Sequence, residues 1–133
     1  MPNLVDVLIL GGGPAGLAVA SGLARQLHTA IVFSTGTFRN ARAEHMHNVA
    51  GWDHEDPSKY RSKARSDILA RYSTIEFKDV GVARVSRLDS GRFEAVDDAG
   101  ERYEGRKVVI ASGIRDVLTK DLPGYEDLWG RGM

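Results

Sequence analysis

The fold is decided by residues 4–16, which read LVDVLILGGGPAG. The residues before the glycines form a short apolar run, typical of a buried strand in a parallel sheet. Pro14 suits the first turn of a helix, because its missing N–H group would have no partner there. Apolar residues then recur with helical spacing at 17, 20, 23, 24 and 27, and Ala30 to Phe33 reads as a second buried strand. The order strand, glycine turn, helix, strand predicts a βαβ unit with a right-handed crossover.

The glycine turn satisfies the pattern G-x-G-x-x-G with Gly11, Gly13 and Gly16. The first glycine allows the tight turn, the second lets a diphosphate approach the backbone, and the third permits close helix–strand packing. The phosphates would meet unpaired N–H groups at the positive end of the helix dipole. Because a strand, a helix and a second strand surround it, the pattern predicts a dinucleotide-binding site. Where an acidic residue normally holds the ribose, this sequence has Ser34 and Thr35, whose hydroxyls we expect to make that contact more weakly.

The rest of the chain predicts one more helix and an antiparallel meander. Residues 34–55 show no sustained period, and Asp56 and Pro57 predict the start of a helix that ends near Tyr72. We expect its Tyr60, Ala64, Ile68, Leu69 and Tyr72 to cover the sheet, and its Lys59, Arg61, Lys63 and Arg65 to point to solvent. Strands are predicted at 74–78, 80–88, 92–96 and 107–111, with turns at 89–91 and 98–100 and a solvated strand and turn at 102–107. The fold class is therefore α/β, a three-layer, Rossmann-like dinucleotide-binding fold with helices on one face of a parallel sheet and the meander on the other.

Composition excludes several classes of function. The chain has 133 residues, which suits one domain. Its 18 basic and 18 acidic side chains cancel, so no basic field draws it to nucleic acid or an anionic membrane. No apolar stretch is long enough to span a bilayer, and the early apolar run lacks the features of a signal peptide, so we expect a cytoplasmic protein. The absence of cysteine excludes a disulfide, thiol chemistry and a thiolate zinc site.

Some polar and aromatic residues leave alternatives open. His45, His47, Asp53 and His54, beside three further acidic residues, could form a metal site, but a polar loop over the cofactor is the favoured interpretation and we assign no metal. We expect His28 to cap carbonyl groups at the end of the first helix or to interact with its dipole. Trp52 and Trp129 are expected to be core or interface residues.

Two sets of motifs carry a family resemblance. Residues 8–18, LILGGGPAGLA, resemble the flavin-binding start of the thioredoxin reductases of low molecular weight. Phe38-Arg39-Asn40, residues 45–51 and residues 122–127 resemble, more specifically, the fungal thioredoxin reductase-like enzymes that act on dithiols of secondary metabolites. The resemblance implies flavin adenine dinucleotide (FAD) as cofactor, with a second backbone approach at Ala111-Ser112-Gly113. It also implies that Asn48 lies near the flavin ring, with His47 beside it.

Together the motifs give a set of expected cofactor-binding residues and no catalytic residue. The family's Cys-x-x-Cys pair, expected shortly after residues 130–132, is not in the sequence, and neither is the NADPH-binding domain that follows it. The resemblance therefore implies that residues 1–133 are the first segment of a split, incomplete FAD-binding domain, truncated relative to the family. The expected cofactor-binding residues are Gly11, Gly13, Pro14, Ala15, Gly16, Ser34, Thr35, Arg39, Asn40, His47, Asn48, Ala111 and Gly113.

Three functions remain open from the sequence. The first is an FAD-dependent oxidoreductase of thioredoxin reductase type, which acts on a small dithiol or a thioredoxin-like protein as a homodimer or with a partner that completes it. The second is a dinucleotide-binding module without catalysis, and the third is an inactive remnant. Without cysteine, the chain cannot carry out thiol–disulfide exchange alone under any of the three.

Overall fold

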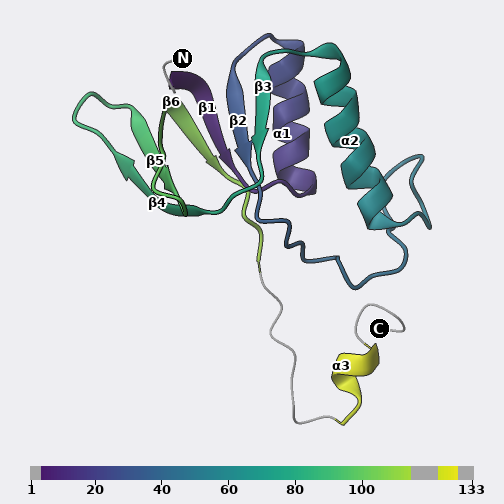
Figure 1. Cartoon of the computed structure of the whole chain (residues 1–133). Helices are drawn as coiled ribbons and strands as arrows, with labels where there is room; N and C mark the ends of the chain where they lie inside the picture. Colours follow the sequence, from purple (N-terminus) through teal and green to yellow (C-terminus); the bar gives the residue numbers. More distant parts are fainter. Residues whose placement is uncertain (1–3, 115–122, 129–133) are drawn as a thin grey trace.

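The computed structural model describes residues 4–114 and 123–128, which form one mixed sheet, longer helices beside it and a short helix that lies apart from the sheet (Figure 1). The six strands of the sheet lie in the order β3-β2-β1-β6-β5-β4. The elements, in chain order, are β1 (Leu4–Leu10), α1 (Pro14–Arg25), β2 (Ala30–Phe33), α2 (Pro57–Arg71), β3 (Ile75–Lys78), β4 (Val82–Arg87), β5 (Phe93–Asp97), β6 (Arg102–Ile110) and α3 (Tyr125–Leu128).

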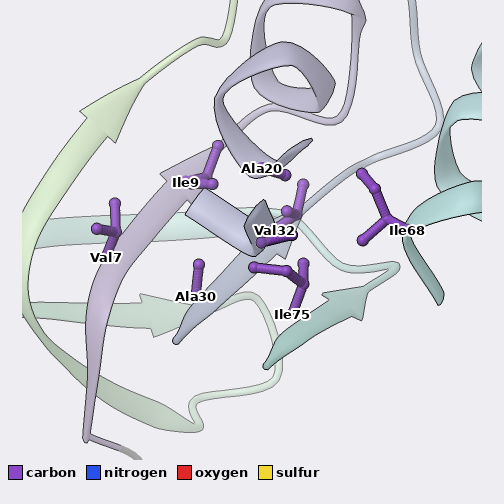
Figure 2. Packing of buried hydrophobic residues seen from close by; sticks show 8 residues of the cluster. Val7, Ile9, Ala20, Ala30, Val32, Ile68 and Ile75 are labelled. Carbon is purple, nitrogen blue, oxygen red and sulfur yellow. The ribbon is translucent and has the colours of Figure 1, made fainter. Parts of the chain in front are cut away.

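The parallel part of the sheet consists of β3, β2, β1 and β6, and α1 and α2 cover one of its faces (Figure 1). Side chains alternate between faces along a strand, so Val7 and Ile9 of β1 point to the helices while Leu8 points away. Figure 2 shows the helix-side core, in which Ala20 of α1 and Ile68 of α2 pack on the strands. The predicted βαβ unit is confirmed.

The antiparallel meander β4-β5-β6 covers the second face of the parallel strands. Leu8, Ile31 and Phe33 form a buried cluster with Ala95 and Tyr103 of the meander. The rings of Phe33 and Tyr103 meet edge to face with centroids 5.1 Å apart. The predicted three-layer packing is confirmed, and the pairing of β6 with both β1 and β5 makes the layers one hydrogen-bonded sheet.

β6 is longer than the sequence predicted, because it begins at Arg102 and not at residue 107. Tyr103 and Gly105 alternate with charged residues and are both buried, so the segment is a half-buried strand and not a solvated turn. Gly105 lies where β6 pairs with both neighbours, and a Cβ atom there would lie 2.6 Å from Cγ of Leu8. The packing of the Leu8 side chain against β6 therefore requires glycine at this position.

Two apolar residues expected in the core are exposed. Leu27 has a φ of +61° just beyond α1 and is 71% exposed, because the helix has already ended. Leu69 of α2 is 51% exposed, whereas Ile68 alone of this helix's large aliphatic residues is buried. The predicted N-cap is confirmed, since Asp56 Oδ1 accepts a hydrogen bond from Ser58 N at 2.7 Å.

The helix cations also differ from expectation. Arg61 and Arg65 are half-buried and lie over the rings of Phe38 and Phe77, so this side of α2 is not simply hydrated. Trp52 packs edge to face on Tyr60 at 5.5 Å, and Trp129 lies outside the described residues. No helix in the described part of the chain has the length and hydropathy that a bilayer crossing needs.

Asp6, the one charged residue in the first strand, joins the starts of β1 and β2. Its Oδ2 accepts hydrogen bonds from Thr29 N at 2.9 Å and from Thr29 Oγ1 at 3.1 Å. The bond from the Thr29 amide is the largest of the effects that lower the pKa of Asp6. Nδ1 of His28 lies 3.5 Å from the same carboxylate, so this imidazole pairs with Asp6 and does not cap α1. The backbone N–H of His28 makes the capping bond instead, to Leu23 O.

Asp97 is a buried carboxylate that closes the turn between β5 and β6. Its Oδ1 accepts hydrogen bonds from Ala99 N and Glu101 N, both at 2.9 Å, and its Oδ2 accepts one from the Tyr103 hydroxyl at 3.1 Å. Both Asp97 and Tyr103 are at most 5% exposed. The meander is therefore fixed to the sheet by a polar contact as well as by apolar packing.

We predict that Asp97→Ala lowers the free energy of unfolding by about 2–4 kcal/mol, because it leaves a buried hydroxyl and two turn N–H groups without an acceptor. Urea denaturation measures the change. Asp89→Ala, in the exposed turn between β4 and β5, is the matched control and should stay within about 0.5 kcal/mol of the wild type. Equal losses in the two variants would contradict a specific role for Asp97.

The same contact predicts a pH dependence. Burial, with the hydrogen bond to Asp97, raises the pKa of Tyr103 to about 12. A raised pKa means that folding favours the neutral phenol, so this stabilisation is complete below about pH 10 and is lost as the pH rises toward 12. Urea midpoints should fall over that window less steeply for Tyr103→Phe than for the wild type. Parallel curves for the two proteins would contradict the prediction.

Candidate functional site

The glycine turn between β1 and α1 is built by close backbone contacts. Gly11 has a φ of +118°, and a Cβ atom there would lie 2.2 Å from the carbonyl oxygen of Ala111. A Cβ atom on Gly16 would lie 1.9 Å from the carbonyl oxygen of Gly11. Both glycines are therefore required by the fold itself, before any ligand is considered. The predicted tight turn and close helix packing are confirmed.

Gly13 has a different environment, which leaves the start of α1 open. It is the N-cap residue, with φ −79° and ψ −169°, and no side chain caps the helix. A Cβ atom on Gly13 would meet only Phe38 Cδ1, at 3.8 Å, which is an ordinary contact. The first turn holds no acidic residue, so its N–H groups present the positive end of the helix dipole without a side-chain acceptor.

A cleft of about 1100 Å³ lies in front of this helix end, where β1, β2 and β6 finish. Its walls come from four parts of the chain: the glycine turn, the segment that follows β2, the start of β4 and the segment that follows β6. Most of the predicted cofactor residues line it, and Gly16, His47 and Asn48 do not. Those that do are Gly11, Gly13, Pro14, Ala15, Ser34, Thr35, Arg39, Asn40, Ala111 and Gly113.

Among residues 4–114 and 123–128, the charges that line the cleft are positive. Arg39 and Arg42 contribute guanidinium groups, and no aspartate or glutamate of these residues lines it. Arg42 Nη2 also donates a hydrogen bond to the carbonyl oxygen of Glu126, so it links the cleft to α3. A cleft of this charge suits an anionic ligand, and its volume suits one as large as a dinucleotide.

Ser34 and Thr35 lie at the end of β2, as predicted, and both hydroxyls support the following turn. Ser34 Oγ accepts a hydrogen bond from Gly36 N at 3.2 Å, and Thr35 Oγ1 accepts one from Thr37 N at 3.4 Å. Each hydroxyl keeps its own hydrogen to donate elsewhere. Ser34 is only 9% exposed, whereas Thr35 is exposed, so Thr35 is the more accessible of the two donors.

The sequence reasoning missed several residues of the cleft. Gly12 received no role, but a Cβ atom there would lie 2.6 Å from Cβ of Ser34, so the turn packs directly on the end of β2. The three consecutive glycines were the available signal. The residues at the start of β4 could not be predicted from the local sequence, because their place in the cleft depends on how β4 packs. The other missed lining residues are Leu10, Phe33, Thr37, Phe38, Arg42, Val80, Gly81, Val82 and Ile114.

His47 and Asn48 belong to a separate loop that closes on itself. Met46 N donates to Glu55 O at 2.7 Å, and His54 N donates to Met46 O at 2.8 Å. Within the loop, Nδ1 of His47 lies 2.8 Å from Asp53 Oδ1. The expected position of His47 and Asn48 near a flavin ring stays a prediction.

The histidines considered as metal ligands are arranged differently from a coordination sphere. The rings of His45 and His54 stack in parallel, with centroids 3.8 Å apart and 10° between the planes. Stacked rings direct their nitrogen lone pairs side by side and not toward one point. Across residues 4–114 and 123–128, no group of three or more metal-binding side chains is positioned to hold an ion.

Comparisons with known proteins agree with this arrangement. A family profile described as pyridine nucleotide-disulphide oxidoreductase matches residues 5–133. The chain is 47% identical to the thioredoxin reductase aclD of Aspergillus oryzae, over 98% of this chain and 41% of that protein. It is 45% identical to the thioredoxin reductase tcpT of Claviceps purpurea, with the same shares covered. Among solved structures, an oxidoreductase of Agrobacterium tumefaciens superposes with a TM-score of 0.86 at 30% identity, over 98% of this chain and 43% of that one. The chain thus spans about two fifths of the length of these relatives.

The two glycines of α1 give a matched test of the turn. We predict that Gly16→Ala lowers the free energy of unfolding by about 2–3 kcal/mol, because the new methyl group must displace the backbone of Gly11. Gly22→Ala, in the same helix, points into open space and should raise stability by about 0.5–1 kcal/mol. Thermal or urea unfolding measures both. A neutral Gly16→Ala would show that α1 does not depend on this close approach.

Proposed function

Because this chain belongs to the pyridine nucleotide-disulphide oxidoreductase family, we propose that it binds FAD in the cleft at the start of α1. The resemblance to fungal thioredoxin reductases that the sequence predicted is confirmed by identities of 45–47%. The observation that carries the proposal is a helix N-terminus with a glycine N-cap and no side-chain cap, which faces a large cleft whose charged lining residues, within the described chain, are Arg39 and Arg42. This combination fits a diphosphate flanked by two nucleoside-like groups.

Different residues of the cleft would bind different parts of the ligand. The amides from Gly13 to Gly16 would bind the diphosphate, and the hydroxyls of Ser34 and Thr35 would donate to the ribose. Arg39 and Asn40 would contact the phosphate or the adenine. Gly113 follows β6 with a φ of +71°, and a Cβ atom there would meet nothing within 4 Å, so the backbone is open to a ligand at this second approach.

We propose that the redox function is that of a thioredoxin reductase-like flavoprotein. A bound flavin supplies two-electron transfer between a nicotinamide and a disulfide, and the chain's own residues bind and orient it. None of the 133 residues is a cysteine, so the thiols of the reaction would belong to other residues or to a partner. The names of the fungal relatives favour a thioredoxin-like protein as the redox partner, reduced at its disulfide, and the disulfide form of a small dithiol is the alternative. Residues 1–133 would be one segment of an FAD-binding domain completed by other residues, by a second copy or by a partner.

A binding module without catalysis is the second candidate, favoured by the same lack of cysteine.

The test of binding is a titration of the purified chain with FAD, followed by quenching of flavin fluorescence. ADP should compete because it carries the adenosine diphosphate half of the ligand, and riboflavin should not. No saturable binding of FAD or ADP would overturn the proposal. NADPH-dependent bleaching of the bound flavin would favour the enzyme over the binding module.

Gly13→Ser separates binding from folding. Serine is a preferred N-cap, so we predict that the variant unfolds within about 1 kcal/mol of the wild type. Its side chain would occupy the amides that the diphosphate needs, so the dissociation constant for FAD should rise by at least about tenfold. Gly22→Ala is the control and should bind as the wild type does. Unchanged affinity in Gly13→Ser would place the ligand elsewhere.

A further inference from the structure

One wall of the cleft has little structure of its own. Residues 34–45 form no helix or strand, and Phe38 and Asn40 of this segment line the cleft. Local hydrogen bonds stabilise only short turns, such as those from Ala41 N to Phe38 O and from Ala43 N to Asn40 O. The position of this wall therefore depends on contacts with other elements.

Arg61 of α2 makes two such contacts with one guanidinium group. Its Cζ lies 4.0 Å from the centroid of the Phe38 ring, and its Nη1 donates a hydrogen bond to Asn40 Oδ1 at 2.8 Å. A planar guanidinium can stack on a ring and donate in its own plane at the same time, which a lysine cannot do. Arg61 thus contacts two residues of the wall that are two positions apart, and it reaches both from behind the cleft.

The space behind the wall is otherwise poorly filled. A second cavity, of about 230 Å³, lies between the wall and α2, and both Phe38 and Arg61 line it. Ser58 and Ser62 of α2 line it too, together with the apolar side chains of Leu17 and Phe77. Because a cavity lies behind it, close packing alone does not fix this part of the wall, and the two contacts of Arg61 add to what holds it.

The charge of Arg61 is also distinctive. Burial lowers its pKa, and the nearby charge of Asp56 partly offsets the effect. None of the ion pairs formed within residues 4–114 and 123–128 includes Arg61. Its positive charge therefore adds to the field on the cleft, although the nearby charge of Asp56 reduces this contribution.

Arg65, one helical turn later, provides an internal comparison. Its Cζ lies 4.6 Å from the centroid of the Phe77 ring, so it stacks in the same way. Its two terminal nitrogens donate to Asp79 Oδ1 at 2.7 Å and Oδ2 at 3.0 Å, a bidentate pair that neutralises its charge. Phe77 and Asp79 do not line the cleft. The two arginines thus share a helix, a type of contact and a place on the smaller cavity, but Arg61 contacts two residues that line the cleft, whereas the partners of Arg65 do not line it.

We propose that Arg61 is a positioning residue for the nucleotide, which holds the wall formed by Phe38 and Asn40 in the position that accepts the adenosine diphosphate part of the ligand. This inference rests on the proposed function. It assigns to α2 a part in ligand binding although Arg61 itself does not line the cleft.

The experiment compares Arg61→Met with Arg65→Met in the full chain, with ADP and FAD as the probes. Methionine keeps much of the side-chain volume but removes the charge and the planar donor group. Arg61→Met should raise both dissociation constants by roughly tenfold, whereas Arg65→Met should change them less than about twofold. Stability, measured by urea denaturation, should fall at least as much in Arg65→Met, because that variant leaves Asp79 without its partner.

Two further variants separate positioning from a structural effect. Arg61→Lys keeps the charge but not the stacking plane, so its affinity should lie between those of Arg61→Met and the wild type. In a double-mutant cycle with Phe38→Leu, the losses in affinity should be strongly non-additive, because Arg61 acts through Phe38.

Four results would overturn the inference. The first two are wild-type affinity in Arg61→Met and equal losses of affinity in Arg61→Met and Arg65→Met. The third is an affinity of Arg61→Lys equal to that of the wild type or to that of Arg61→Met. The fourth is additive losses of affinity in the double-mutant cycle. A wild-type chain that binds neither ADP nor FAD would instead overturn the proposed function, and this inference with it. The two kinds of failure are therefore distinct.

Discussion

The close approach of α1 to the end of β1 is the constraint on which the rest of the structure depends. The helix comes so near that Gly16 has no room for a Cβ atom beside the carbonyl oxygen of Gly11. Gly11 in turn leaves no room beside Ala111, which follows β6. These contacts fix the direction of α1 relative to the ends of β1 and β6. The open amides at its start consequently face the place where β1, β2 and β6 finish, and not solvent.

The second constraint is that the parallel strands are buried on both faces. Leu8 of β1 contacts the meander, while its neighbours Val7 and Ile9 contact the helices. Gly105 leaves room for the side chain of Leu8 beside β6. Asp97, at the turn of the meander, accepts a hydrogen bond from the hydroxyl of the buried Tyr103. Because the meander is held in this way, the start of β4 reaches the cleft and forms one of its walls. The meander, although it forms a separate layer, therefore also shapes the cleft.

Electrostatics divides the two arginines of α2 into different roles. Arg65 is paired with a carboxylate and joins α2 to the segment after β3. Arg61 lies over Phe38 and carries a charge that no carboxylate of the described chain pairs with. Burial makes such a charge costly unless something compensates it, and an anionic ligand in the adjacent cleft would do so.

The sequence by itself determined the local elements of this protein and the heart of its site. The apolar run of β1, the three glycines and Pro14 predicted the strand, turn and helix because each depends on neighbours along the chain. This pattern predicted the cleft residues of the glycine turn and of the end of β2, and the family resemblance added others, among them Arg39 and Gly113. Only the tertiary structure decided the features that depend on distant segments. These are the start of β6 at Arg102, the exposure of Leu27 and Leu69, the pairing of Asp6 with Thr29, and the position of Arg61 over Phe38. Hydrophobic periodicity shows which face of a helix or strand is apolar, but it does not show which other element that face packs against. Arginine is therefore assigned to solvent by its charge, until the fold brings a ring and an amide within its reach.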